Sequence, residues 1–157
     1  METVIFKESK YMVTKAQTRF SDFSMNGNLH FSKCLMYFEK ARFEVSKISG
    51  LASAFLSEYP MGVSFVVVKV DNTYLSPISL SVGQNERELL VLTRLMKPGK
   101  IGKLSFEQIL IDADTKEELI DGIVDVAVVS DGKTIGVFSD ECLKCLTDYY
   151  NSYVTCE

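Results

Sequence analysis

Three polar residues just before a glycine turn have side chains that can act on a carbonyl group. Asp22, Ser24 and Asn26 alternate along the chain and are followed by Gly27. A carboxylate, a hydroxyl and an amide can orient water or stabilise developing charge. In a regular strand, Asp22 and Ser24 would point to the same face, which would make Asp22 a second candidate base.

An amphipathic helix is predicted directly after this turn, from Phe31 to about Ser49. Its apolar residues recur three or four positions apart, and Gly50 is a typical helix stop. Asn28 is placed to cap the helix. The first turn of such a helix presents free backbone N–H groups and the positive end of the helix dipole. The apolar stripe is expected to consist of Phe31, Cys34, Leu35, Phe38, Ala41, Val45 and Ile48.

The order of residues in this stretch resembles hot-dog thioesterases of the hydroxybenzoyl-CoA and acyl-CoA thioesterase type. That family has an aromatic or Arg-rich strand, then Asp-x-Asp-x-x-Gly, then a helix with Tyr-Phe-Glu-x-Ala-Arg. Ser24 stands where the family places its catalytic Asp. Gly27-Asn28 followed by an apolar residue is similar to the branch that releases enediyne polyketides, which also lacks this Asp. The matching residues are Arg19, Phe20, Asp22, Gly27, Tyr37, Phe38, Glu39, Ala41, Arg42 and Glu44.

The resemblance extends over about residues 12–138. Residues 72–77, with the later Gly83, look like the family's Tyr-Leu-x-Pro segment. Residues 105–108, and residues 112–114 followed by Glu118-Leu119, also fit the family.

The resemblance implies an acyl thioester hydrolase that acts on acyl-CoA or acyl-carrier-protein thioesters and releases a fatty acyl or polyketide chain. It places the Phe31 backbone N–H at the family's polarising amide and matches Arg42 to an arginine that stabilises charge near the thioester. Ser24 and Asn26 would orient water, and Glu39 is an alternative base. Ser24 as a nucleophile would need an activating neighbour. We expect the acyl chain to contact Met36, Phe55, Leu56 and Tyr74.

Each of these residues also has a purely structural interpretation. Phe31 can be the first core residue of the helix, and Ser24 and Asn26 can be ordinary turn residues. Arg42 can be a surface residue paired with Glu39 or Asp22. A non-catalytic acyl-thioester binding or regulatory module is therefore the alternative function, since Ser24 cannot replace the missing base.

The rest of the chain predicts a single α+β domain over residues 1–157. Strands are expected at 12–21, 63–70, 89–96, 104–112 and 120–129, and a C-terminal helix capped by Ser139 or Asp140 at 139–150. One long central helix covered by an antiparallel sheet of about five strands is the hot-dog arrangement. Residues 63–70 are almost continuously apolar, so this strand is expected to be buried on both faces or to lie at a homodimer or homotetramer interface.

The composition and net charge of the chain argue against nucleic-acid and membrane partners. The chain has 157 residues, 46% hydrophobic and 24% charged, and a net charge of −4. This is a globular composition without the basic field that recruits nucleic acid or anionic membranes. Residues 1–12 do not resemble a signal peptide, and no apolar run approaches the roughly 20 residues that span a bilayer, so we expect a cytoplasmic protein. With one histidine, His30, and a C-x-x-C at Cys142 and Cys145 in a helical context, neither a metal nor a cofactor is predicted.

Overall fold

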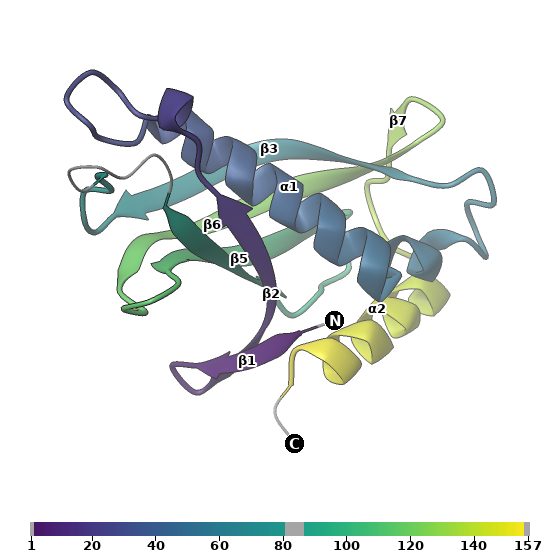
Figure 1. Ribbon diagram of the computed structural model, residues 1–157. Helices are drawn as coiled ribbons and strands as arrows, with labels where there is room; N and C mark the ends of the chain where they lie inside the picture. Colours follow the sequence, from purple (N-terminus) through teal and green to yellow (C-terminus); the bar gives the residue numbers. More distant parts are fainter. Residues whose placement is uncertain (1, 81–86, 156–157) are drawn as a thin grey trace.

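The computed structural model describes residues 2–80 and 87–155 (Figure 1). Gly83 of the resemblance and Cys156 lie outside these residues. The elements in chain order are β1 (Thr3–Phe6), β2 (Ser9–Gln17), η1 (Phe20–Asp22), α1 (Phe31–Ser49), η2 (Leu51–Phe55), β3 (Ser64–Tyr74), β4 (Glu88–Leu95), β5 (Lys103–Asp112), β6 (Glu118–Ser130), β7 (Lys133–Thr134) and α2 (Asp140–Tyr153).

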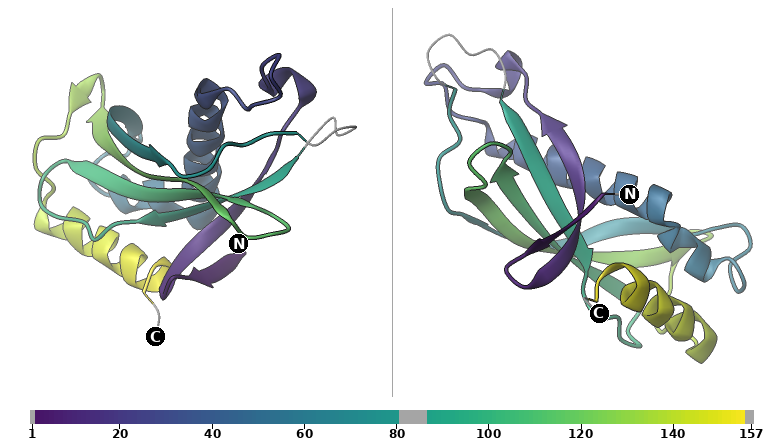
Figure 2. Two further views of the ribbon diagram at one scale, coloured as in Figure 1. Left: turned by 90° about the vertical axis from the view of Figure 1, so that its left-hand side faces the viewer. Right: turned by 60° about the horizontal axis from the view of Figure 1, so that its bottom comes forward.

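One antiparallel sheet carries the long helix α1 on one face, as Figures 1 and 2 show. The strand order is β1-β2-β4-β5-β6-β3, and β7 pairs with β6. The α+β prediction with one long helix is confirmed. The number of strands was underestimated, because the described residues form a seven-stranded sheet rather than one of about five.

The predicted first strand, residues 12–21, was misplaced. The strand β2 ends at Gln17, and the chain then forms a short 3-10 turn in which the Arg19 N–H donates to Asp22 Oδ2 at 2.9 Å. The preceding strand β1 was missed because the β1–β2 turn uses Lys7 and Glu8 at φ 47° and 65°. Charged residues are not the usual signal for a hairpin turn, which favours Gly, Asn or Asp.

The limits of α1 were predicted correctly, but its cap was not. The helix runs from Phe31 to Ser49, and Gly50 ends it in the left-handed conformation at φ 73°. The residue at the N-cap is His30, whose side chain makes no capping hydrogen bond, rather than Asn28. Asn28 instead forms an isolated β-bridge with Ser79.

The buried face of α1 is narrower than the predicted stripe. The residues that face the sheet are Cys34, Phe38, Ala41, Val45 and Ser49. The predicted core residues Phe31, Leu35 and Ile48 are exposed, and Phe31 retains 65% of its accessible surface. A helix on a sheet buries only a narrow face, so the apolar residues at the margins of the stripe remain accessible.

The apolar strand β3 lies at the edge of the sheet. It pairs with β6 along its whole length, and Val66, Val67, Val68 and Val70 remain exposed. Burial on both faces within one chain was therefore wrong, because no further strand of the described chain covers this edge.

The C-terminal helix α2 closes the end of the core beside η2. It begins where predicted, since the Ser139 hydroxyl accepts a hydrogen bond from the Cys142 N–H at 3.0 Å. Cys142 is buried in the first turn, and burial together with Glu58 and Cys145 raises its pKa to about 11. A protonated, buried thiol is a poor nucleophile. This C-x-x-C is therefore part of the helix packing.

Candidate functional site

Ser24 and Asn26 lie in a tight turn ahead of α1. The Gly27 N–H donates to the Ser24 carbonyl at 2.9 Å, and the Ser24 N–H donates to the Asn28 carbonyl at 2.8 Å. Gly27 adopts φ 79°, a conformation that glycine reaches without strain. Ser24 is half-buried, whereas Asn26 is exposed at the tip. Ser24 is thus the less exposed of the two, and neither residue is among those that line the pocket at the helix start.

Asp22 is held as a structural anchor. Its carboxylate accepts hydrogen bonds from the Tyr37 hydroxyl at 2.5 Å and the Arg19 N–H at 2.9 Å, and Lys33 lies 3.8 Å away. Burial alone would raise its pKa, but these partners together hold the pKa of Asp22 below its ordinary value. A carboxylate engaged in this way is a weak base, so Asp22 does not replace the missing Asp.

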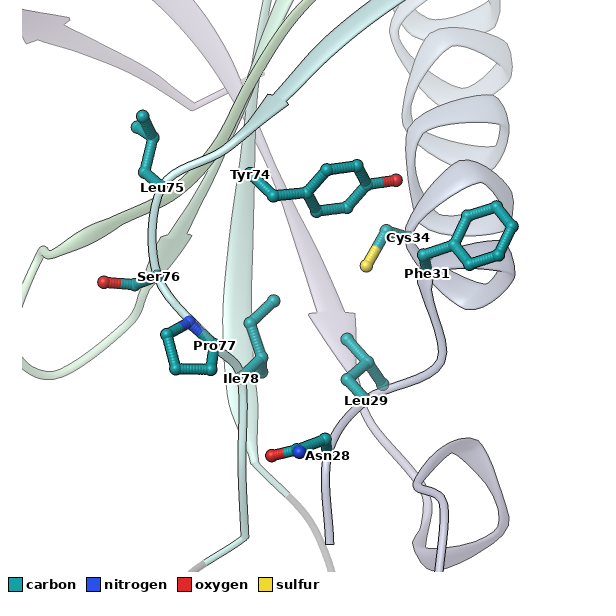
Figure 3. A pocket seen from close by; sticks show the side chains of 9 residues that line it. All are labelled: Asn28, Leu29, Phe31, Cys34, Tyr74, Leu75, Ser76, Pro77 and Ile78. Atoms are coloured by element: carbon teal, nitrogen blue, oxygen red, sulfur yellow. The ribbon is translucent and has the colours of Figure 1, made fainter. Parts of the chain in front are cut away.

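A pocket of about 300 Å³ opens at the start of α1 (Figure 3). The first helical residue, Phe31, lies on its wall, and the Tyr74 hydroxyl points toward the first turns of the helix. The segment after β3 is tied to the turn by a hydrogen bond from the Leu29 N–H to the Ile78 carbonyl at 2.7 Å. The lining residues are Asn28, Leu29, Phe31, Cys34, Tyr74, Leu75, Ser76, Pro77 and Ile78.

A larger groove of about 870 Å³ runs between α1 and the β3 edge of the sheet. Apolar side chains from β3, β5 and β6 form much of its wall, including Phe65, Val67, Phe106 and Val126. On the helix side, Met36, Glu39, Lys40, Arg42, Phe43, Ser46 and Lys47 contribute. An apolar channel with a few polar groups suits an acyl chain.

Arg42 is anchored to the sheet instead of lying on the surface. Its Nη1 donates to the Gln108 Oε1 at 2.7 Å, and the Gln108 Nε2 donates to the Phe38 carbonyl and to the Thr93 hydroxyl, both at 3.0 Å. Burial lowers the pKa of Arg42, although a guanidinium remains charged at neutral pH. Glu39 acts on Arg42 only through its charge, which partly offsets the lowering of the pKa, and no close ion pair of Arg42 with Glu39 or Asp22 is found among the described residues.

The structure separates Arg42 from the Phe31 N–H. Gln108 holds the guanidinium beside Phe38, which lies seven residues after Phe31 and therefore about 10 Å further along the helix. Oxyanion donors must lie about 3 Å from the oxygen that they stabilise. Within one chain, these two predicted groups therefore do not act on the same carbonyl oxygen.

The predicted acyl-binding residues fall in different places. Met36 lines the groove, and Tyr74 lines the pocket at the helix start. The Phe55 ring is fully buried and lies 6.1 Å from the ring of Phe65, so it supports the groove wall from behind. Leu56 is about half exposed and lies outside the residues that line the groove.

Gln108 is the residue whose role was missed. The available signal in the sequence was a glutamine directly before the apolar residues 109–111 of the predicted strand, and the structure shows that it is fully buried. Only the packing of α1 on β5 shows that its partner is Arg42.

In the part of the chain that the structure describes, no cluster of side chains is suited to a metal ion. None of the described helices has the length and apolar character needed to cross a membrane.

Among the comparisons with known proteins, the one with solved structures shows the fold. No protein-family model and no curated protein matches the chain. A probable thioesterase from Escherichia coli has a TM-score of 0.70 at 16% identity over 89% of this chain and 99% of its own. A 1,4-dihydroxy-2-naphthoyl-CoA thioesterase from Synechocystis gives 0.65 at 12% over 87% and 95%, and a probable thioesterase from Bartonella henselae gives 0.62 at 19% over 80% and 96%. The chain therefore has the hot-dog fold.

Proposed function

We propose that the protein is an acyl thioester hydrolase that acts on acyl-CoA thioesters. The observation that carries the proposal is the pocket lined by Phe31, the first residue of α1, together with the apolar groove farther along the same helix. The first turn of a helix has backbone N–H groups without intrahelical partners. Such N–H groups can stabilise the negative charge that develops on a thioester oxygen. Solved structures of the same fold are described as thioesterases, which supports this assignment.

The proposed mechanism is attack by water on the thioester carbonyl. The Phe31 N–H would polarise the carbonyl, and Ser24 would help to orient the water. Arg42 would contact the substrate farther along the groove rather than at the same oxygen. Acyl-carrier-protein thioesters and polyketide chains are included in the proposed substrate range on the basis of the enediyne-like turn.

The test is steady-state release of free thiol from a panel of acyl-CoA and acyl-carrier-protein thioesters. Turnover that is saturable and proportional to enzyme concentration would support hydrolysis. Tight binding of the same thioesters, measured by calorimetry, without any thiol release would favour the non-catalytic binding module. Ser24 at the position of the missing carboxylate is the observation that keeps this second function open.

Assembly gives a separate prediction. We expect a homodimer, or a tetramer made of two such dimers, because one edge of β3 pairs with no other strand in the described part of the chain and Val66, Val67 and Val70 are exposed. Exposed apolar strand edges are normally covered by a partner. Light scattering of the wild type at micromolar concentration should give at least twice the chain mass.

The control for assembly places a charge on the same edge. Val67→Lys should shift the protein toward monomer, whereas Lys15→Glu on the far strand β2 should leave the mass unchanged. A wild type that is a stable monomer would contradict the prediction.

A further inference from the structure

Asn72 places a side-chain amide on the helix-facing side of β3, next to apolar neighbours. It pairs across the sheet with Gly122, and the Val70–Val124 pair is adjacent on the same face. Its Oδ1 and Nδ2 atoms are both buried, and neither reaches a partner with good hydrogen-bond geometry among the described residues. Leaving such groups unpaired costs about 1–3 kcal/mol each, so an amide retained here calls for a functional explanation.

Gly122 makes room for this amide. A Cβ atom built on Gly122 would lie 1.9 Å from the Asn72 Oδ1 and 2.9 Å from its Cγ. Gly122 is not among the glycines with positive φ, so its backbone conformation does not require glycine. What glycine provides at this position is space, and the Asn72 amide occupies it.

Tyr74 lies two residues after Asn72 on the same face of β3. Its ring lines the pocket at the start of α1, and its hydroxyl points toward Phe31 and Cys34 (Figure 3). Burial and the nearby Cys34 raise the pKa of Tyr74, and the Asn72 amide offsets part of this rise. Residues two apart on a strand project to the same face, so the amide and the phenol are neighbours on this face of β3. The raised pKa keeps the phenol protonated at neutral pH.

We propose that the Tyr74 hydroxyl is a second oxyanion donor beside the Phe31 N–H, and that Asn72 is a positioning residue for this hydroxyl. The proposal rests on the thioesterase function proposed above. Sites that stabilise an oxyanion commonly combine more than one donor, and the helix start supplies only backbone N–H groups. A neutral phenol can donate to the oxygen as its charge develops.

Tyr74 forms no covalent bond to the substrate in the proposed reaction. Water adds its oxygen to the acyl carbon, and the carbonyl oxygen becomes an oxyanion held by Tyr74 and the Phe31 N–H. The oxyanion then collapses and the carbon–sulfur bond breaks. The two protons of the attacking water are shared between the thiol and the carboxyl product, which ionises in solution.

Tyr74→Phe removes the hydroxyl and keeps the ring, so it is the direct test. Loss of one oxyanion donor is expected to lower kcat on acyl-CoA by about 100- to 1,000-fold with a much smaller change in KM. The fold should remain intact because Tyr74 is about half exposed. Tyr150→Phe on α2 is the matched control and should keep the wild-type kcat. An unchanged kcat in Tyr74→Phe would overturn the proposal while the thioesterase function stands.

The role of Asn72 is tested by a double-mutant cycle with Gly122. Asn72→Ala should lower kcat at least about tenfold, since a displaced donor loses most of its effect. Gly122→Ala should do the same in the wild type, because the new methyl group displaces the amide, but should cost little more in the Asn72→Ala background. Additive losses from the two changes would show that Gly122 acts independently of Asn72.

A spectroscopic readout separates this inference from the thioesterase function. In the wild type, the carbonyl stretch of a bound, isotope-labelled acyl-CoA should lie at a lower frequency than in water, and Tyr74→Phe should reverse this shift. If the wild type shows this shift but no turnover, the contact between Tyr74 and the carbonyl stands and the hydrolase function is rejected. A carbonyl stretch that is identical in the wild type and in Tyr74→Phe would reject the contact.

Discussion

A Ser24→Asp variant is expected to hydrolyse simple acyl-CoA thioesters about 100 to 10,000 times faster than the wild type, the range typical of a positioned general base. Ser24 occupies the place that the resemblance assigns to the catalytic Asp. It is half-buried in the turn immediately before α1. Aspartate is well tolerated at the first position of a turn, so the backbone hydrogen bonds of Ser24 with Gly27 and Asn28 should persist.

The matched control is Ser24→Asn, which has nearly the shape of the aspartate variant but no basic oxygen. It should leave the rate near the wild-type value. A new carboxylate base must be ionised to act, so the activity of Ser24→Asp should fall as the pH drops through the pKa of that carboxyl. Neither the wild type nor Ser24→Asn should show this step.

The result also distinguishes the two candidate functions. An inactive wild type that gains turnover with Ser24→Asp would be an acyl-binding module on an enzyme scaffold. An active wild type that is indifferent to Ser24→Asp would mean that the Ser24 side chain does not face the thioester. Glu39, on the rim of the groove, would then be the next carboxylate to replace.

The fold was predictable because its strongest signals are local. The periodicity after Phe31 and the left-handed stop at Gly50 define α1, and the β-branched runs define the later strands. The features that were missed depend on contacts between distant residues. The face that α1 buries is set by its orientation on the sheet, which the spacing of apolar residues alone does not determine.

The contacts of the candidate site residues could not be predicted from the sequence. The pocket at the start of α1 is lined by Phe31 and Tyr74, whereas Ser24 and Asn26 are not among the residues that line it. The separation of Arg42 from Phe31 follows from Gln108, which is 66 residues away from Arg42 in the sequence. The space over Gly122 that admits Asn72 depends on strand register, and a one-residue shift would turn either residue to the other face.

The second large expected effect is a loss of stability when the buried side chain of Phe55 is removed. Phe55→Ala is expected to lower the free energy of unfolding by about 3–5 kcal/mol, as deletion of a buried aromatic ring typically does. Its ring has no exposed surface and lies 5.7 Å from Phe138 and 6.1 Å from Phe65. From the sequence alone, Phe55 was expected to contact the acyl chain, whereas the structure places its ring in the core.

Urea unfolding of Phe55→Ala and Leu56→Ala measures this difference. Leu56 is adjacent in the sequence but 49% exposed, so its truncation should cost less than about 1 kcal/mol. Chain-length preference should change in Phe55→Ala only as far as the loss of support lets Phe65 move in the groove wall. If Phe55→Ala keeps wild-type stability and shifts the substrate profile instead, the acyl chain reaches behind Phe65, and the groove is deeper than the arrangement of these rings indicates.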